Sequence, residues 1–98
     1  MKLLRFDWDE KKNSINTKKH NGVSFEEART VFQDSNARLI SDPDHSDDED
    51  RFVLLGMSER FRVLVICHCY RQDNSVIRII SARKATKKER RTYEEYLG

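Results

Sequence analysis

Three apolar runs lie close together in the second half of this chain, and they constrain the fold more than any other feature. They cover residues 51–57, 61–70 and 76–82, and each has the length and β-branched content of a strand. Only short polar segments, 58–60 and 71–75, separate them. Because turns this short join neighbouring strands that run in opposite directions, the sequence predicts an antiparallel meander.

Helix signals flank this meander on both sides. Asp9 is placed to cap a helix that continues to residues 19–20, and Ser24 with Glu27 has the spacing of a capping box for a second helix. Thr86 with Glu89 repeats that spacing, so a third helix is expected to begin near residue 87.

The first two helices differ in how they would meet a core. The second carries a helical apolar stripe, whereas the first is poor in apolar residues and has Ile15 as its obvious core contact. We therefore expect the first helix to lie exposed and to be held mainly by its ends. The stripe of the second helix consists of Phe25, Ala28, Val31 and Phe32.

Short strands at 4–8 and 37–41 complete the order β-α-α-β-β-β-β-α in one domain, residues 1–98. The predicted fold class is α+β, an antiparallel sheet with the helices packed on one face. The other face would then be an open, polar, functional surface. The strand residues that could populate it are Arg51, Arg62, His68, Arg78 and Arg83.

Charge is segregated along the chain. Residues 76–98 hold seven Lys or Arg and three Glu, a local charge of +4, whereas residues 42–50 hold six acids and no Lys or Arg. Arginines at the end of an apolar strand, followed at once by a helix start, favour an anion such as phosphate. The alternative is that the helix residues Lys87, Lys88, Arg90 and Arg91 form an ordinary solvated face.

Three further groups of residues each allow two interpretations. Lys18, Lys19 and His20 either bind phosphate or complement the dipole of the first helix. His68 is either a histidine satisfied in the core or a site residue. Cys67 and Cys69 alternate along one strand and are expected to be buried and reduced, because no recognised metal-ligand spacing accompanies them.

The acidic segment 42–50 is expected to be a solvated loop, since it lacks the register of a helix-loop-helix calcium site. No cofactor is indicated. No apolar run approaches a membrane span and no secretory pattern begins the chain, so the expected location is the cytoplasm, with no membrane partner.

The chain resembles the BrnT family of bacterial type II toxins. The resemblance extends over nearly the whole chain, with one departure, an Asn21 that interrupts a Lys-His-Gly-Val run. It is carried by Phe6-Asp7-Trp8-Asp9 with Asn13, by Lys19-His20-Asn21-Gly22-Val23-Ser24-Phe25-Glu26-Glu27-Ala28, by Asp42-Pro43-Asp44-His45 with Arg51, and by Arg78-Ile79-Ile80-Ser81-Ala82-Arg83-Lys84-Ala85-Thr86 with Glu89-Arg90 and Tyr93.

This resemblance implies a RelE-like fold and a metal-independent endoribonuclease that inhibits translation. It also implies a BrnA-type antitoxin as partner, in a hetero-oligomer such as 2:2, with operator DNA bound only through the antitoxin. By analogy, Arg83, Arg78 and Arg51 would contact the phosphate and the transition state, and Lys19, His20 and His68 would be candidates for proton transfer. Lys84 and Arg90 would bind RNA, with Tyr93 and Glu89 orienting the basic groups.

Two other classes of function stay open at this point. A non-catalytic RNA- or protein-binding module would use the same cations only for docking. A structural subunit would only pair its basic face with an acidic segment of an antitoxin. Cleavage of RNA separates the enzyme from both, and salt-sensitive affinity for RNA separates the latter two.

Overall fold

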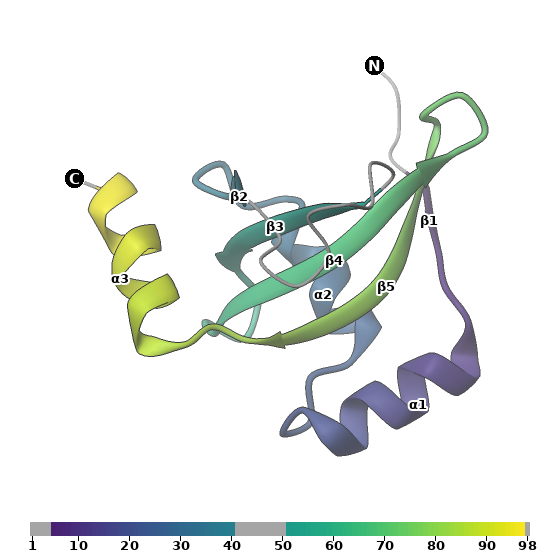
Figure 1. The fold of residues 1–98 in the computed structure, drawn as a ribbon, viewed down its shortest axis with the longest axis horizontal. Coiled ribbons are helices and arrows are strands. Elements are labelled where there is room, and N and C mark those ends of the chain that lie inside the picture. Colours follow the sequence, from purple (N-terminus) through teal and green to yellow (C-terminus); the bar gives the residue numbers. More distant parts are fainter. Residues whose placement is uncertain (1–4, 41–50, 98) are drawn as a thin grey trace.

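A computed structural model describes residues 5–40 and 51–97. The acidic segment 42–50 and His45 lie outside these ranges. The predicted α+β class and the predicted order of elements are confirmed (Figure 1). The elements are β1 (Arg5–Asp7), α1 (Glu10–Lys19), α2 (Phe25–Val31), β2 (Arg38–Ile40), β3 (Phe52–Met57), β4 (Val63–Arg71), β5 (Val76–Lys84) and α3 (Lys87–Tyr96).

The five strands form one sheet in the order β1-β5-β4-β3-β2. The meander β3-β4-β5 is antiparallel, as the short turns predict, and β2 continues it in the same sense. The sheet is nevertheless mixed, because β1 pairs with β5 in parallel, with Asp7 opposite Arg78. The prediction of a wholly antiparallel sheet fails at this strand. Two helices follow β1, so no turn fixes which strand it joins or in which direction.

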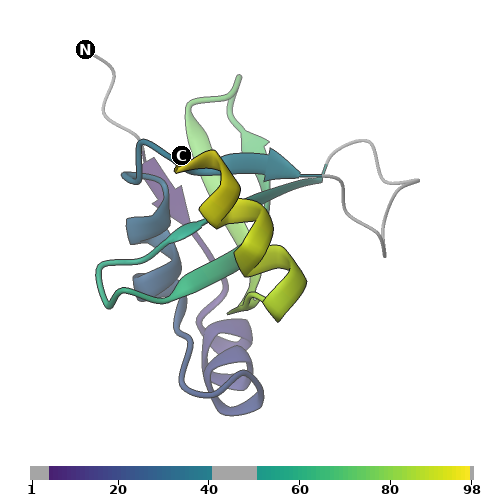
Figure 2. The same ribbon diagram turned by 90° about the vertical axis from the view of Figure 1, so that its left-hand side faces the viewer.

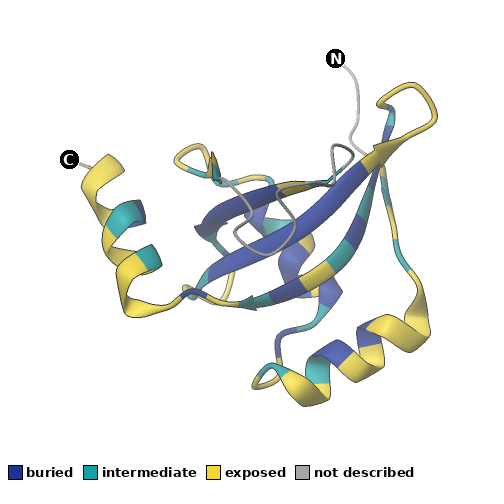
Figure 3. Cartoon of the chain, viewed as in Figure 1, coloured by how far each residue is buried: buried dark blue, intermediate teal, exposed yellow. Residues whose placement is uncertain are grey.

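The helix α2 buries its apolar stripe against one face of the sheet. Phe25, Ala28 and Val31 are fully buried and cluster with strand residues such as Leu54 and Ile66. Figure 3 shows the strands β3 and β4 buried along most of their length and α1 largely exposed. The predicted stripe of α2 is therefore the centre of the main core, which is where burial of apolar area contributes most to stability.

The helix α3 does not share that face. Its Tyr93 clusters with Val53, Leu55 and Val65, which alternate along β3 and β4 with the residues that face α2. Successive strand residues point to opposite faces, so α3 covers the side of the sheet opposite α2. Figures 1 and 2 show α3 well apart from α1 and α2. The prediction that all helices pack on one face is wrong for α3.

The helix α1 is held by two buried asparagines. Asn16 donates to the carbonyl oxygens of Val23 (2.9 Å) and Ala82 (2.8 Å), and its amide oxygen accepts from the Ala82 N–H (3.1 Å). Asn13 accepts from the Phe25 N–H at 2.8 Å. Ile15 is 63% exposed, so the expectation that it contacts the core is wrong. Polar side chains satisfy backbone groups here where an apolar face would leave them unpaired.

We expect Asn16→Ala to destabilise the protein by about 2–3 kcal/mol, because three buried backbone groups would lose their partner. Chemical denaturation measures this loss. Ser14→Ala, at an exposed position of the same helix, is the control and should change stability by less than about 0.5 kcal/mol. Equal stabilities of the two variants would contradict this role of Asn16.

Each helix begins at the predicted cap. Asp9 accepts from the first-turn amides of α1, and Ser24 accepts from the Glu27 N–H. At α3 the full capping box is present, with Thr86 and Glu89 satisfying each other's N–H. The second box is only half formed, because the Glu27 carboxylate is turned toward Arg62 and Ser58.

Arg62 and Glu27 join the β3–β4 turn to α2. Glu27 is 3% exposed and forms an ion pair with Arg62 and a 2.7 Å hydrogen bond with the Ser58 hydroxyl. Burial alone raises the pKa of Glu27, but the hydrogen bonds from Arg62 and Ser58 outweigh it, so this pKa lies below its usual value of 4.5. Arg62 is therefore committed to this contact and does not lie on an open polar face.

The two cysteines are buried and are not joined in a disulfide, as the sequence predicts. A bulge in the pairing of β4 with β5 follows Cys67.

Among the described helices, none is both long and apolar enough to cross a membrane.

Candidate functional site

The carboxyl end of α1 lies beside the point where β5 leads into α3. The two hydrogen bonds between Asn16 and the backbone of Ala82 fix this arrangement, one residue before Arg83 (Figure 1). His20 caps α1 four residues after Asn16, and its N–H donates to the Asn16 carbonyl oxygen at 2.9 Å. Two chain segments that both carry predicted cations therefore meet at one place.

Positive charges from both segments lower the pKa of His20. Its side chain is half-buried, and burial, the ammonium of Lys19 and the guanidinium of Arg83 together lower its pKa below the usual value of 6.5. Each of these effects disfavours the imidazolium. A neutral imidazole near two cations can accept a proton, which is what a general base requires.

Arg83 is held in place by Glu89. Two parallel hydrogen bonds of 2.8 and 3.0 Å join its guanidinium to both carboxylate oxygens. The same carboxylate accepts the Thr86 N–H at 2.9 Å. The hydrogen bond with Arg83 is the main reason why the pKa of Glu89 falls from 4.5 to about 2. Glu89 therefore orients Arg83, which remains 36% exposed.

We call Lys19, His20, Arg83 and Glu89 the junction cluster. The structure does not bring the other predicted arginines into it. Arg78 lies five positions before Arg83 on β5 and pairs with Asp7 at 2.6 Å. Arg51 comes just before the first residue of β3, whereas Arg83 lies level with Leu55, toward the other end of that strand, through the pairs Leu55–Val65 and Val65–Arg83. The expected pocket of several guanidinium groups is therefore not present among the described residues.

His68 lies inside the protein. Its side chain is fully buried, and the rings of Phe32 and Tyr70 meet it edge-on at centroid distances of 4.9 and 5.4 Å. Burial lowers its pKa below 6.5. Nδ1 lies 3.3 Å from the Ile66 carbonyl oxygen. Of its two interpretations, the core histidine is the one that the structure shows, and His68 does not populate an open polar face. It follows Leu64 and Ile66 at every second position of β4, so regular alternation places it on the α2 side, beside Phe32.

The remaining predicted residues lie near the cluster in sequence but differ in exposure. Lys84 and Arg90 are exposed. Tyr93 is 2% exposed, and its hydroxyl donates to Asp34 at 2.6 Å. Burial and this bond raise the pKa of Tyr93 to about 12. Tyr93 thus anchors α3 and does not orient the basic groups.

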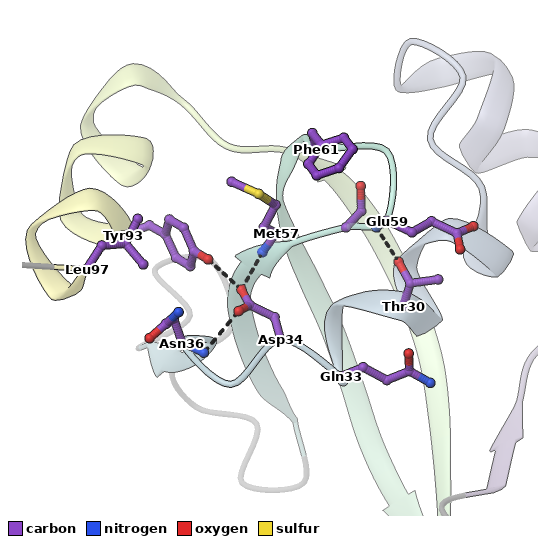
Figure 4. A pocket seen from close by; sticks show the side chains of 10 residues that line it. Thr30, Gln33, Asp34, Asn36, Met57, Glu59, Phe61, Tyr93 and Leu97 are labelled. Atoms are coloured by element: carbon purple, nitrogen blue, oxygen red, sulfur yellow. Dashed lines mark hydrogen bonds between the residues drawn. The ribbon is translucent and has the colours of Figure 1, made fainter.

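A pocket of about 430 Å³, which the sequence did not indicate, lies between α3, the β3–β4 turn and the segment after α2 (Figure 4). Asp34 organises it by accepting hydrogen bonds from the Met57 N–H (2.8 Å) and from Tyr93. Burial alone would raise the pKa of Asp34, but these bonds and one from the Asn36 N–H outweigh it. The pKa of Asp34 therefore lies below its usual value of 3.8. No short motif marks the pocket, because its walls come from distant segments.

Among the described residues, no three His, Cys, Asp or Glu side chains gather closely enough to hold a metal ion.

Residues 8–89 match the model of the family described as the ribonuclease toxin, BrnT, of type II toxin-antitoxin systems. No curated protein matches the sequence. The fold is similar to the 1.1 Å crystal structure of the Brucella abortus ribonuclease toxin BrnT, with a TM-score of 0.66 and 20% sequence identity over 87% of this chain and 100% of that one. The family match covers most of the chain, including the whole junction cluster, and we conclude that this protein belongs to the BrnT family of ribonuclease toxins of type II toxin–antitoxin systems.

Proposed function

We propose that this chain is a metal-independent endoribonuclease of the RelE-like kind, that it inhibits translation by cutting RNA in the cytoplasm, and that the junction cluster is its active site. Membership of the BrnT family supports the ribonuclease activity. The observation that carries the choice of site is the meeting of His20 and Lys19 with Arg83 where β5 leads into α3.

The proposed step is transfer of a phosphodiester to the neighbouring 2′-hydroxyl. A base removes the hydroxyl proton, the 2′ oxygen bonds to phosphorus, and the bond from phosphorus to the 5′ oxygen breaks. The 5′ oxygen takes up a proton. The products are a 2′,3′-cyclic phosphate and a 5′-hydroxyl. Neutral His20 is the proposed base, and its imidazolium can then return the proton.

Arg83 and Lys19 are the proposed partners of the phosphate. Negative charge grows on the non-bridging oxygens as the 2′ oxygen attacks, and a guanidinium already oriented by Glu89 stabilises that charge without reorganising. Lys84 and Arg90, both exposed next to this region, extend the cationic surface along an RNA backbone. Arg78, Arg51 and His68 lie away from the cluster and have no part in this proposal.

Cleavage of purified RNA in the presence of EDTA, with identification of both new ends, tests the proposed function. We expect fragments with 2′,3′-cyclic phosphate and 5′-hydroxyl ends. Intact RNA at every protein concentration would overturn the enzymatic proposal. Fragments that appear only when divalent cations are added back would overturn metal independence alone.

We also propose that a BrnA-type antitoxin neutralises the protein in a hetero-oligomer such as 2:2, and that the complex binds operator DNA only through the antitoxin. The family is one of type II toxin–antitoxin systems, which supports a protein antitoxin.

One observation favours a second candidate, a non-catalytic module that docks RNA or protein. Arg83 and Arg78 are each bound to a carboxylate, and both are partly exposed. Cations held in this way suit docking as well as catalysis. The cleavage experiment distinguishes the two, because a docking module would bind RNA and leave it whole.

A further inference from the structure

The pocket beside α3 has an apolar rim that is exposed to solvent. Phe61 is 84% exposed and Leu97 49%, and both line it together with Met57 and the ring of Tyr93 (Figure 4). Removing side chains of this kind from water is favourable, at about 25 cal/mol for each Å² of apolar surface. The apolar rim therefore favours binding of an apolar side chain.

Phe61 is held in a strained conformation. Its φ is +61°, in the left-handed region that bulky residues rarely adopt. Hydrogen bonds at both ends of the turn maintain it, from the Phe61 N–H to the Ser58 carbonyl oxygen (3.0 Å) and from the Ser58 N–H to the Arg62 carbonyl oxygen (2.9 Å). Strain of this kind is concentrated at binding and active sites, and here it presents an aromatic ring to solvent.

The opposite wall of the pocket is preformed. Asp34 accepts the Tyr93 hydroxyl and the Met57 N–H with one oxygen and the Asn36 N–H with the other, which fixes α3 against β3. Because these contacts exist before any partner binds, a ligand would not have to order the pocket, and the entropic cost of binding is reduced.

The charge of the pocket disfavours RNA and favours a basic peptide segment. Its described lining includes Asp34 and Glu59 and no Lys or Arg, although the chain has 19 Lys and Arg and a net charge of +2. The neighbouring Arg62 is turned away, toward Glu27. Phosphates would be repelled here, whereas an apolar side chain beside a Lys or Arg would match both the rim and the carboxylates.

We propose that this pocket is a docking site for the antitoxin, which inserts an apolar side chain between Phe61, Met57 and Leu97 and places a basic residue near Glu59. The inference rests on the proposed function only in taking the partner to be the antitoxin. It separates the surface that binds the antitoxin from the junction cluster.

The test measures binding of the purified cognate antitoxin, together with cleavage of RNA by the free toxin. Phe61→Asn removes the ring and keeps a residue that tolerates positive φ, so the turn should persist. We expect its affinity for the antitoxin to fall about 30-fold, the loss typical of a binding hot spot, and RNA cleavage to remain that of the wild type. Glu59→Lys should weaken binding about 10-fold through charge repulsion.

Two control variants match these changes. Ile15→Asn removes another highly exposed apolar side chain, on α1, and Glu95→Lys reverses an exposed charge of α3 that does not line the pocket. Both should bind the antitoxin as the wild type does. Wild-type affinity in Phe61→Asn, or an equal loss in Ile15→Asn, would overturn the proposal.

Two other outcomes would also overturn it. Loss of RNA cleavage in Phe61→Asn with antitoxin binding intact would assign the pocket to RNA. A wild-type toxin that dimerises alone, and a Phe61→Asn variant that stays monomeric, would assign it to a second copy of this chain. If the wild type binds the antitoxin but cuts no RNA, only the enzymatic proposal fails, and the binding comparison can still be made.

Discussion

Alanine at His20 is expected to lower the rate of RNA cleavage by about 10²–10⁴-fold, the usual contribution of a general base. The fold should be unchanged, because the helix-ending hydrogen bond at this position comes from the backbone N–H and not from the imidazole. Single-turnover cleavage of a short RNA measures the loss, and circular dichroism with thermal melting verifies the fold.

Lys18→Ala is the matched control for this experiment. Lys18 is exposed in the same last turn of α1, but it is not among the charges that lower the pKa of His20. It should lose far less activity than the His20 variant. A His20→Ala protein that cleaves RNA like the wild type would remove His20 from the mechanism and leave Lys19 as the candidate for proton transfer in the junction cluster.

Arg62→Ala is expected to destabilise the protein by about 3–5 kcal/mol, because it leaves the buried carboxylate of Glu27 without its counter-ion. The Ser58 hydroxyl would be the only remaining side-chain partner that the structure describes for this carboxylate. Arg62 also reaches the carbonyl oxygens of Asn21 and Gly22 at 3.3 and 3.5 Å, so the turn after α1 would loosen too. Urea denaturation at pH 7 measures the effect.

The pH dependence gives this prediction a second, independent readout. In the wild type the pKa of Glu27 is lowered in the folded state, so its contribution to stability is present above the usual value of 4.5 and is lost as pH falls through the folded-state pKa. Without Arg62, burial raises that pKa instead. The difference in the free energy of unfolding between Arg62→Ala and the wild type should therefore become smaller in acid. A difference that is constant with pH would contradict the role of Arg62 as the counter-ion of Glu27.

The elements of the fold could be predicted because their signals are local. The run 76–82 reads as a strand from its own residues, and Thr86 with Glu89 marks a helix start that the structure shows as a full capping box. The meander follows from turn lengths alone. These features depend on residues a few positions apart, which the sequence displays directly.

The features that could not be predicted depend on distant contacts. The three-residue strand β1 pairs with β5, 71 positions away, and nothing near β1 specifies that partner. Asn16 reaches Ala82 across a similar distance, so a helix that looks unattached in sequence is firmly held. The packing of α3 on the far face depends on contacts of Tyr93 with Val53, Leu55 and Val65, residues of two other strands that the sequence of α3 does not specify.

The same distinction applies to the candidate site. Lys19 with His20, and Arg83 with Glu89, were separate sequence signals, and the contact of α1 with β5 brings them together. Arg78 looked equivalent to Arg83 in sequence, but its neighbour on β1 is Asp7, which pairs with it. His68 alternates with Cys67 and Cys69 in sequence, but only the packing of α2 and Phe32 shows that its side of β4 is the covered one. Alternation along a strand shows which residues share a face, but not which face the helices cover.

The most direct test of the junction cluster is an NMR titration of the His20 imidazole in the wild type, in Arg83→Gln and in Arg78→Gln. If His20 and Arg83 share one site, the wild-type pKa lies below 6.5 and rises when Arg83 is neutralised, because a nearby positive charge is removed. Arg78→Gln, on the same strand but outside the cluster, should leave it unchanged. A His20 pKa that is the same in all three proteins would contradict the account.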